Sequence, residues 1–288
     1  MLGINERNLH YIYTHNSRRD FQIADDKTVT KGVLDAIGVP HPATYAVYGY
    51  FYELGNLGEE LGPYTDFVIK PVHGRGGGGI VVVTGRDGGG WSAAGGRVYT
   101  QEGLKRHISD IIFGVYSFDL HDQAMVEARV EQHPEMADMS RLGLADIRVV
   151  FFKNEPVLTM TRIPTYASEG KANIHQGAVG VGIDMATGRT IHAVYRDRVV
   201  TRHPDTGVGL LGRRIPFWDR VIEVGRRVAR AVPLKYLGID VAIGADDVMV
   251  LEINVRPGLQ IQDVNRKGMR TILDGLGRGP GGPGEAGP

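Results

Sequence analysis

The sequence predicts an α+β protein with two lobes and antiparallel sheets. Chain length is the first observation, because 288 residues, 42% of them hydrophobic, suffice for two lobes with sizeable cores. The second is a series of strand-like segments joined by short turns, since such hairpins pair antiparallel. The third is a small number of amphipathic helical segments placed among these strands.

Composition excludes several classes of function. Lys+Arg and Asp+Glu both number 33, so no overall field favours nucleic acid or an acidic membrane as a partner. Cysteine is absent, which excludes disulfides, thiolate metal sites and a cysteine nucleophile. The polar first 20 residues lack the apolar core of a signal peptide, and no later apolar run approaches the roughly 18 residues of a membrane span. A cytoplasmic location is therefore expected.

The first half of the chain begins with a predicted helix that opens at Asp25 or Asp26 and ends at Gly38. An acidic cap, apolar residues at helical spacing and a terminal glycine support this helix. The expected elements that follow are strands at 67–70, 80–83 and 97–100 and a helix over 101–113.

The second half is expected to consist mostly of strands. Its predicted elements are a strand at 125–132, a Met-rich polar connection at 133–143, a hairpin of 145–152 with 156–163, a helix from Pro216 to 232, and strands at 238–244 and 248–255. Glycine and proline dominate the end of the chain, which predicts disorder. The expected organisation is a short N-terminal segment at 1–25, a small lobe at 26–126, a large lobe at 127–276 and a disordered tail at 277–288.

A glycine-rich loop lies between two of the strands, with five glycines among the six residues from Gly74 to Gly79. The pattern G-x-G-x-x-G does not indicate a dinucleotide fold, because a strand and not a helix follows it. A protein kinase would carry its lysine after the loop together with H-R-D and D-F-G, and a Walker motif would contain G-K-S or G-K-T; all are absent. The remaining hypotheses are a flap that covers phosphate groups beside Lys70, or a flexible surface hairpin with a solvated lysine.

Three oxygen-bearing side chains near the C-terminus form the second constellation. Glu252 and Asn254 are two apart on one strand and so share a face. If residues 245–247 form a hairpin turn, Asp240 falls opposite Glu252 on that face. Hard oxygen ligands in apolar surroundings suit magnesium, and the alternative is that these side chains point to water from a half-exposed sheet.

Taken together, these segments resemble the ATP-grasp superfamily, and most closely the RimK-like α-L-glutamate ligases. The resemblance covers roughly residues 25–258 and consists of six motifs in order: DDKTVTKGVLDAIGVPHPAT, FVIKPVHGRGGGG, MVEARV, DIRVVFF, KANIHQGA and GIDVAIG with LEINVRPGL. It implies an ATP-grasp fold whose two lobes clasp ATP between antiparallel sheets. The N-terminal domain that precedes this fold in RimK-like ligases is mostly missing, because only about 25 residues come before the first helix.

The resemblance also implies roles for individual residues. ATP would be bound by Lys27, Lys70, Gly74, Gly76, Gly77, Gly78, Glu127, Ala128, Asp146, Lys171 and Asn173. Two magnesium ions, with manganese as an alternative, would be held by Asp240, Glu252 and Asn254. The acceptor carboxylate or the developing acyl phosphate would be bound by Arg148, Arg162, His175 and Arg256, unless these form structural ion pairs.

The implied activity is ATP-dependent ligation of a carboxylate to an amine through an acyl phosphate, adding glutamate or another amino acid to a small molecule, peptide or protein. A phosphotransferase and a non-catalytic nucleotide-binding regulatory protein are the alternatives. Two departures bear on the substrate: the linker at 131–145 is longer than in the RimK-like family, and Gly177-Ala178 replaces Gly-Gly after the histidine. A second copy of the chain or another protein could complete the acceptor site.

Overall fold

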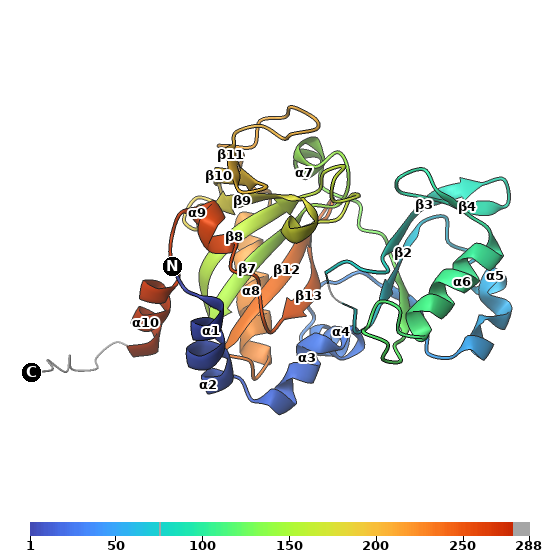
Figure 1. The fold of residues 1–288 in the computed structure, drawn as a ribbon, viewed down its shortest axis with the longest axis horizontal. Coiled ribbons are helices and arrows are strands. Elements are labelled where there is room, and N and C mark those ends of the chain that lie inside the picture. The colour runs from blue at the N-terminus through green and yellow to red at the C-terminus, as the bar shows by residue number, and fades with distance from the viewer. Residues whose placement is uncertain (75, 279–288) are drawn as a thin grey trace, which may run out of the picture.

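The computed structural model describes residues 1–74 and 76–278, which form two lobes built on antiparallel sheets (Figure 1). Within these residues, one sheet has six strands in the order β1-β6-β2-β3-β4-β5, and the other has seven in the order β11-β10-β9-β8-β7-β12-β13. Helices pack on both sheets, so the α+β class with two antiparallel sheets is confirmed. Of the tail predicted at 277–288, residues 279–288 lie outside the described residues.

The small lobe contains the six-stranded sheet. Its elements are β1 (Thr44–Tyr48), η3 (Phe51–Asn56), α5 (Leu57–Glu60), β2 (Phe67–Pro71), β3 (Val81–Asp87), β4 (Gly90–Ala93), β5 (Val98–Tyr99), α6 (Gln101–Ile112) and β6 (Ala124–Glu127). Helix α6 buries four apolar residues at helical spacing, as predicted. These residues pack with apolar residues of η3, α5 and β2 in a core that is separate from the core of the other lobe.

The large lobe contains the seven-stranded sheet. Its strands are β7 (Asp146–Phe152), β8 (Glu155–Ile163), β9 (Val179–Ile183), β10 (Thr190–Tyr195), β11 (Arg198–Val200), β12 (Tyr236–Ile243) and β13 (Val248–Asn254). Its helices are α7 (Pro134–Met139), η4 (Ile174–Gln176), α8 (Trp218–Ala231), α9 (Ile261–Asn265) and α10 (Arg270–Arg278). The Met-rich connection contains α7, which the sequence pattern does not predict; Met136 and Met139 are buried there. No helix within the described residues is long and apolar enough to cross a bilayer.

Helix α4 (Lys27–Ala36) lies between the two sheets (Figure 1). The side chain of Asp26 accepts hydrogen bonds from the backbone N–H groups of Thr28 and Val29, and this cap fixes the start of the helix as the sequence predicts. Gly38 follows the helix with φ of 60°, a conformation that favours glycine. Helix α4 contacts β13, so the cap and the first turn stand beside the strand that carries Glu252.

The polar N-terminal segment folds onto the large lobe. It forms α1 (Ile4–Glu6), η1 (Arg7–Ile12), α2 (Tyr13–His15), η2 (Arg18–Phe21) and α3 (Gln22–Asp25). Leu2, Tyr11, Ile12 and Phe21 are buried in the same core as the seven-stranded sheet. Residues 1–25 therefore form part of the packed large lobe, where Figure 1 shows α1 and α2 beside α10.

One buried side chain fastens this segment to the sheet. Asn16 donates to the carbonyl of Tyr236 at 2.7 Å, and its oxygen accepts from the N–H groups of Lys235 and Tyr236 at 2.7 and 3.0 Å. Replacing Asn16 by alanine leaves these buried groups unpaired, and we expect unfolding in urea to show a loss of about 2 kcal/mol. The exposed Asn56→Ala is the matched control and should change stability by less than about 0.5 kcal/mol. An equal effect of both variants would contradict this role.

Candidate active site

Strand register brings the charged residues of the large lobe together. In the β12–β13 hairpin Asp240 is paired with Glu252, as expected, although nearer the turn Ile243 pairs with Val248 and a register shift between Asp240 and Val241 produces the pair. Strand β7 lies on the other side of β12 and pairs Arg148 with Asp240. Strand β8 pairs Arg162 with Asp146. The neighbouring strands β8, β7, β12 and β13 therefore bring together charged residues that lie in four separate segments of the sequence.

These side chains form a buried ionic cluster. Arg148 donates to both oxygens of Asp240, through Nε at 2.7 Å and Nη2 at 2.6 Å. Arg162 binds both oxygens of Asp146 and also reaches Asp240 Oδ2 at 2.9 Å. Asn254 Nδ2 donates to the same Asp240 oxygen at 3.1 Å. The two arginines thus bridge two buried carboxylates, an arrangement in which each charge depends on its partners.

The two carboxylates differ in acidity. Burial would raise the pKa of Asp240, but Arg148 and Arg162 outweigh burial and lower its pKa to about 2. Burial, together with repulsion from Asp240, raises the pKa of Asp146 to about 6 despite its bonds to Arg162. Asp240 therefore keeps its negative charge at neutral pH, and Asp146 is the member of the cluster that accepts a proton more readily.

A second group of charges lies at the junction of α4 and the small lobe. Glu127 is buried on β6, where Lys70 Nζ lies 2.5 Å from Oε1 and Lys31 Nζ lies 2.7 Å from Oε2. Lys27, at the start of α4, is a further cation nearby. Burial lowers the pKa of Lys27, and the charge of Glu252 opposes this shift. Three lysines and the Glu127 carboxylate are thus grouped together, with Glu252 of β13 near Lys27, and such a group of ammonium ions is suited to a polyanion.

Among the residues expected to bind ATP, the resemblance to the ATP-grasp superfamily implies that Glu127 and Ala128 contact adenine through side chain and backbone. In this structure both oxygens of Glu127 are paired with lysines, and the Ala128 N–H donates to the carbonyl of Ala43 at 2.8 Å. Contact of these residues with adenine stays a prediction.

The glycine-rich loop crosses from the small lobe to the large lobe. Gly76 and Gly77 have φ of 68° and 81°, in the region that favours glycine. The carbonyl of Gly76 accepts hydrogen bonds from Asn173 Nδ2 and Gln176 Nε2, each at 2.8 Å. Gly79 has φ of 72°, and a Cβ atom there would lie 2.7 Å from the ring of Tyr116. Glycine is therefore required at the tip for conformation and at Gly79 also for space.

Comparison of the sequence with protein families identifies the family of the chain. The profile of sugar-transfer associated ATP-grasp proteins matches residues 6–277. The chain belongs to this ATP-grasp family. No curated protein matches the sequence significantly.

Several solved structures are similar to the chain at low sequence identity. D-alanine–D-alanine ligase from Bacillus anthracis is 14% identical, with a TM-score of 0.50 over 92% of this chain and 75% of that chain. The ATP-grasp ligase PsnB, solved with a minimal precursor, is 18% identical with a TM-score of 0.47, over 91% of this chain and 62% of PsnB. D-cycloserine synthetase DcsG is 15% identical with a TM-score of 0.46, over 88% of this chain and 71% of that chain. The chain therefore spans less than two thirds of PsnB. The similarity to D-alanine–D-alanine ligase, at 14% identity, bears on the fold alone.

The donor set of this ATP-grasp chain fits magnesium. Glu252 is half-buried, and no side chain within the described residues donates a hydrogen bond to it. Asn254 uses its amide N–H toward Asp240, which leaves its oxygen as a second ligand. Within residues 1–74 and 76–278 no three His, Cys, Asp or Glu side chains surround one position. Magnesium commonly takes one or two carboxylates and completes its shell with water and substrate phosphates. Glu252 and Asn254 would therefore hold the ion, with Asp240 shared between it and the arginines.

Three further predicted site residues, Lys171, His175 and Arg256, make their contacts outside the ionic cluster of this ATP-grasp protein. Lys171 pairs with Glu169 at 3.3 Å on the surface. His175 is exposed, and its Nε2 accepts a hydrogen bond from Gln260 Nε2 at 2.7 Å. The guanidinium of Arg256 lies over the ring of Phe21 at 5.1 Å, next to the N-terminal segment. The contacts of Arg256 are with the N-terminal segment rather than with the other predicted acceptor residues.

Several residues with evident positions in the site were not predicted. Lys31 completes the pair of lysines on Glu127, and Gln176 shares the flap carbonyl with Asn173. His73 and Asp122 meet at the base of the flap. Lys31 lies one helical turn after Lys27, and this spacing is the only local signal in the sequence that could have found it. Asp122 lies 49 positions from His73, so no local pattern joins them.

Proposed function

We propose that the protein is an ATP- and magnesium-dependent carboxylate–amine ligase. A substrate carboxylate attacks the γ-phosphorus of ATP, which breaks the bond to ADP and gives an acyl phosphate. An amine then displaces phosphate and forms an amide. The observation that carries this proposal is that Glu252 interacts through its charge both with Lys27 of α4 and with Arg162 of the Asp240–Arg148–Arg162 cluster, next to a glycine flap that spans both lobes.

The residues supply mainly position and charge. Lys27 and Lys70 would bind phosphate oxygens, because both ammonium groups lie where the flap begins. Arg148 and Arg162 would stabilise the charge that spreads over the transferring phosphoryl group, since Asp240 and Asp146 hold both guanidiniums in place. Magnesium, when bound at Glu252 and Asn254, would neutralise phosphate charge and orient the phosphates. The flap would exclude water from the acyl phosphate.

The substrates are proposed from two kinds of support. The similar solved structures include D-alanine–D-alanine ligase, an ATP-grasp ligase solved with a precursor, and D-cycloserine synthetase. The family description, sugar-transfer associated, favours a sugar that bears a carboxylate or an amine as one of the two substrates. We therefore propose that the protein joins an amino acid, glutamate among the candidates, to a partner molecule of this kind.

The test is a product assay. The protein is incubated with ATP, magnesium and pools of amino acids, uronic acids and amino sugars, and products are followed by mass spectrometry together with release of ADP. We expect an amide with a stoichiometric amount of ADP. Glu252→Gln should lower turnover at least about 100-fold, because it removes a charge that holds the ion. The exposed Glu59→Gln is the matched control and should retain turnover.

Other outcomes separate the alternatives. A phosphorylated product without an amide would replace the ligase with a phosphotransferase. Binding of ATP with no acid-dependent turnover would favour a nucleotide-binding regulatory protein. Removal of magnesium with EDTA should abolish turnover, and turnover that persists in EDTA would contradict the metal assignment.

A further inference from the structure

The base of the glycine flap, residues 72–74, is held by groups from both sides. Val72 N–H donates to the carbonyl of Gln123 at 2.9 Å in the small lobe. From α4, Lys27 Nζ donates to the carbonyls of Val72 and Gly74 at 3.1 and 3.0 Å. His73 lies between these two carbonyls. The flap therefore begins from a fixed backbone rather than from a loose connection.

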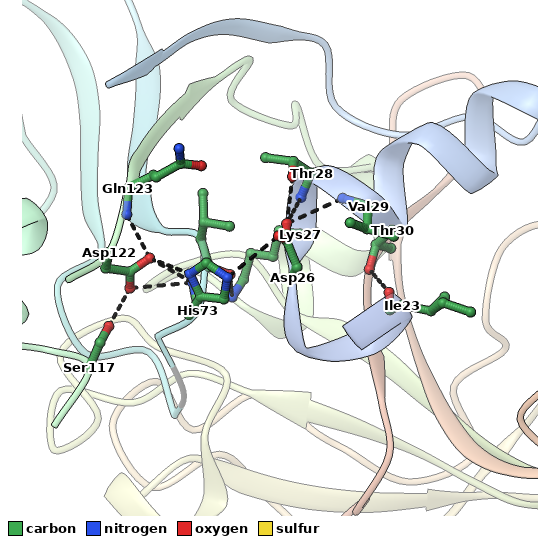
Figure 2. Close-up of polar contacts among 11 residues, drawn as sticks. Ile23, Asp26, Lys27, Thr28, Val29, Thr30, His73, Ser117, Asp122 and Gln123 are labelled. Carbon is green, nitrogen blue, oxygen red and sulfur yellow. Dashed lines mark hydrogen bonds and ion pairs between the residues drawn. The ribbon is translucent and has the colours of Figure 1, made fainter. Parts of the chain in front are cut away.

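Asp122 fixes the imidazole of His73 (Figure 2). The Asp122 carboxylate is fully buried and lies 2.8 Å from His73 Nδ1, while it also accepts from the His73 N–H at 3.0 Å. Ser117 and the Gln123 N–H donate to the same carboxylate. Because an ionised carboxylate only accepts, Nδ1 carries a proton and the ring has one defined orientation.

The opposite edge of the ring faces α4. His73 Nε2 lies 3.4 Å from Asp26 Oδ2, and Figure 2 shows the ring between the two carboxylates. The other Asp26 oxygen accepts from Thr28 and Val29 at the helix cap. Burial would raise the pKa of Asp26, but these bonds and the charge of His73 lower it, so Asp26 is negative at neutral pH. Because Nδ1 already carries a proton toward Asp122, the contact of Nε2 with Asp26 is favourable in the imidazolium form, in which one side chain joins the cap of α4 to the small lobe.

We propose that His73 is a positioning residue that ties the base of the flap to α4 through Asp26 and to the small lobe through Asp122, so that the flap is preorganised to close over nucleotide phosphates. This inference rests on the proposed function, in which the flap covers ATP. It differs from the phosphate contacts given to Lys27 and Lys70, because His73 acts through the flap backbone.

Burial and contacts at the far end support this role. The side chain of His73 is 45% exposed, whereas that of its partner Asp122 is 0% exposed. A histidine that only faced solvent would not need a fully buried carboxylate as its partner. At the returning end of the flap, His107 Nε2 lies 2.8 Å from the carbonyl of Gly79. With both ends fastened, the freedom that the glycines confer is limited to the tip, which lowers the entropy lost on closing.

The test measures flap order and nucleotide use separately. Hydrogen exchange of the amides at 76–80 is followed by mass spectrometry in His73→Ala, His73→Asn and Asp26→Ser. We expect exchange about three- to tenfold faster in His73→Ala. His73→Asn keeps a donor toward Asp122 but cannot reach Asp26, so its effect should be intermediate. Asp26→Ser keeps a helix cap and removes only the link to His73, and it should match His73→Asn. The two changes combined should be less than additive.

Kinetics and controls complete the test. The KM for ATP should rise by a factor similar to the change in exchange, while kcat changes less, because His73 orders the flap and touches no reacting atom. The exposed His10→Ala is the control and should leave exchange at 76–80 unchanged. If His73→Ala does not fold, His73→Asn and Asp26→Ser carry the test. Wild-type exchange at 76–80 in both of those variants would overturn the inference, even in an active ligase. Absence of any turnover would instead overturn the proposed function, and the exchange data would still decide the role of His73.

Discussion

Replacing Arg162 by methionine is expected to destabilise the protein by about 3–5 kcal/mol at neutral pH. The side chain of Arg162 is only 12% exposed and binds both oxygens of Asp146, and it also contacts Asp240 at 2.9 Å. Methionine fills a similar volume but leaves Asp146 buried without its cation, whereas Asp240 keeps Arg148. The free energy of unfolding, measured in urea, tests this expectation.

Two further variants show whether the loss comes from the unpaired charge. The surface variant Arg141→Met removes an exposed pair with Asp138 and should cost less than about 1 kcal/mol. Adding Asp146→Leu to Arg162→Met should restore much of the lost stability, because both members of the pair are then apolar. If the double variant is less stable than Arg162→Met alone, the cost lies in packing and not in the unpaired carboxylate.

The two hairpins could be predicted because strand-like segments joined by short turns are a local signal, and Lys153 and Asn154 adopt positive φ at the turn between β7 and β8. The pairing of Asp240 with Glu252 is predicted from the turn alone, but the register at the turn, where Ile243 pairs with Val248, would place Leu251 opposite Asp240. A register shift between Asp240 and Val241 moves the pairing to Glu252, and no local pattern indicates this shift. Motif order then supplied the ATP-grasp fold that the structure shows.

Contacts between segments distant in the chain could not be predicted in this way. Lys31 on α4 contacts Glu127 on β6 only in the folded chain, and helical spacing alone gave no reason for a lysine to be buried. The N-terminal segment is polar along its sequence, yet Arg7 and Asn16 are buried because each satisfies a backbone group of the large lobe. A polar residue therefore indicates exposure only when no distant partner exists.

The second large effect is expected at Glu127, where Glu127→Gln should cost about 3–5 kcal/mol at pH 7. Glutamine keeps the shape of the side chain but removes the negative charge between Lys31 and Lys70, so two buried ammonium groups lose their counter-charge. Urea unfolding measures the loss, and the exposed Glu102→Gln, which breaks a pair with Lys105 at 3.5 Å, should change stability by less than about 1 kcal/mol.

The pH dependence of this difference distinguishes charge from shape. Burial would raise the pKa of Glu127, but Lys70 and Lys31 outweigh burial and lower it below the ordinary value of 4.5. A carboxyl whose pKa is lowered on folding stabilises the protein fully above its unfolded pKa, and this stabilisation is lost as pH falls through the folded pKa. The difference between wild type and Glu127→Gln should therefore be constant above about pH 5.5 and should shrink as pH falls below 4.5, since the wild-type carboxyl becomes neutral as well. A difference that stays the same down to pH 3 would mean that the amide fails through its hydrogen-bond geometry and not through the missing charge.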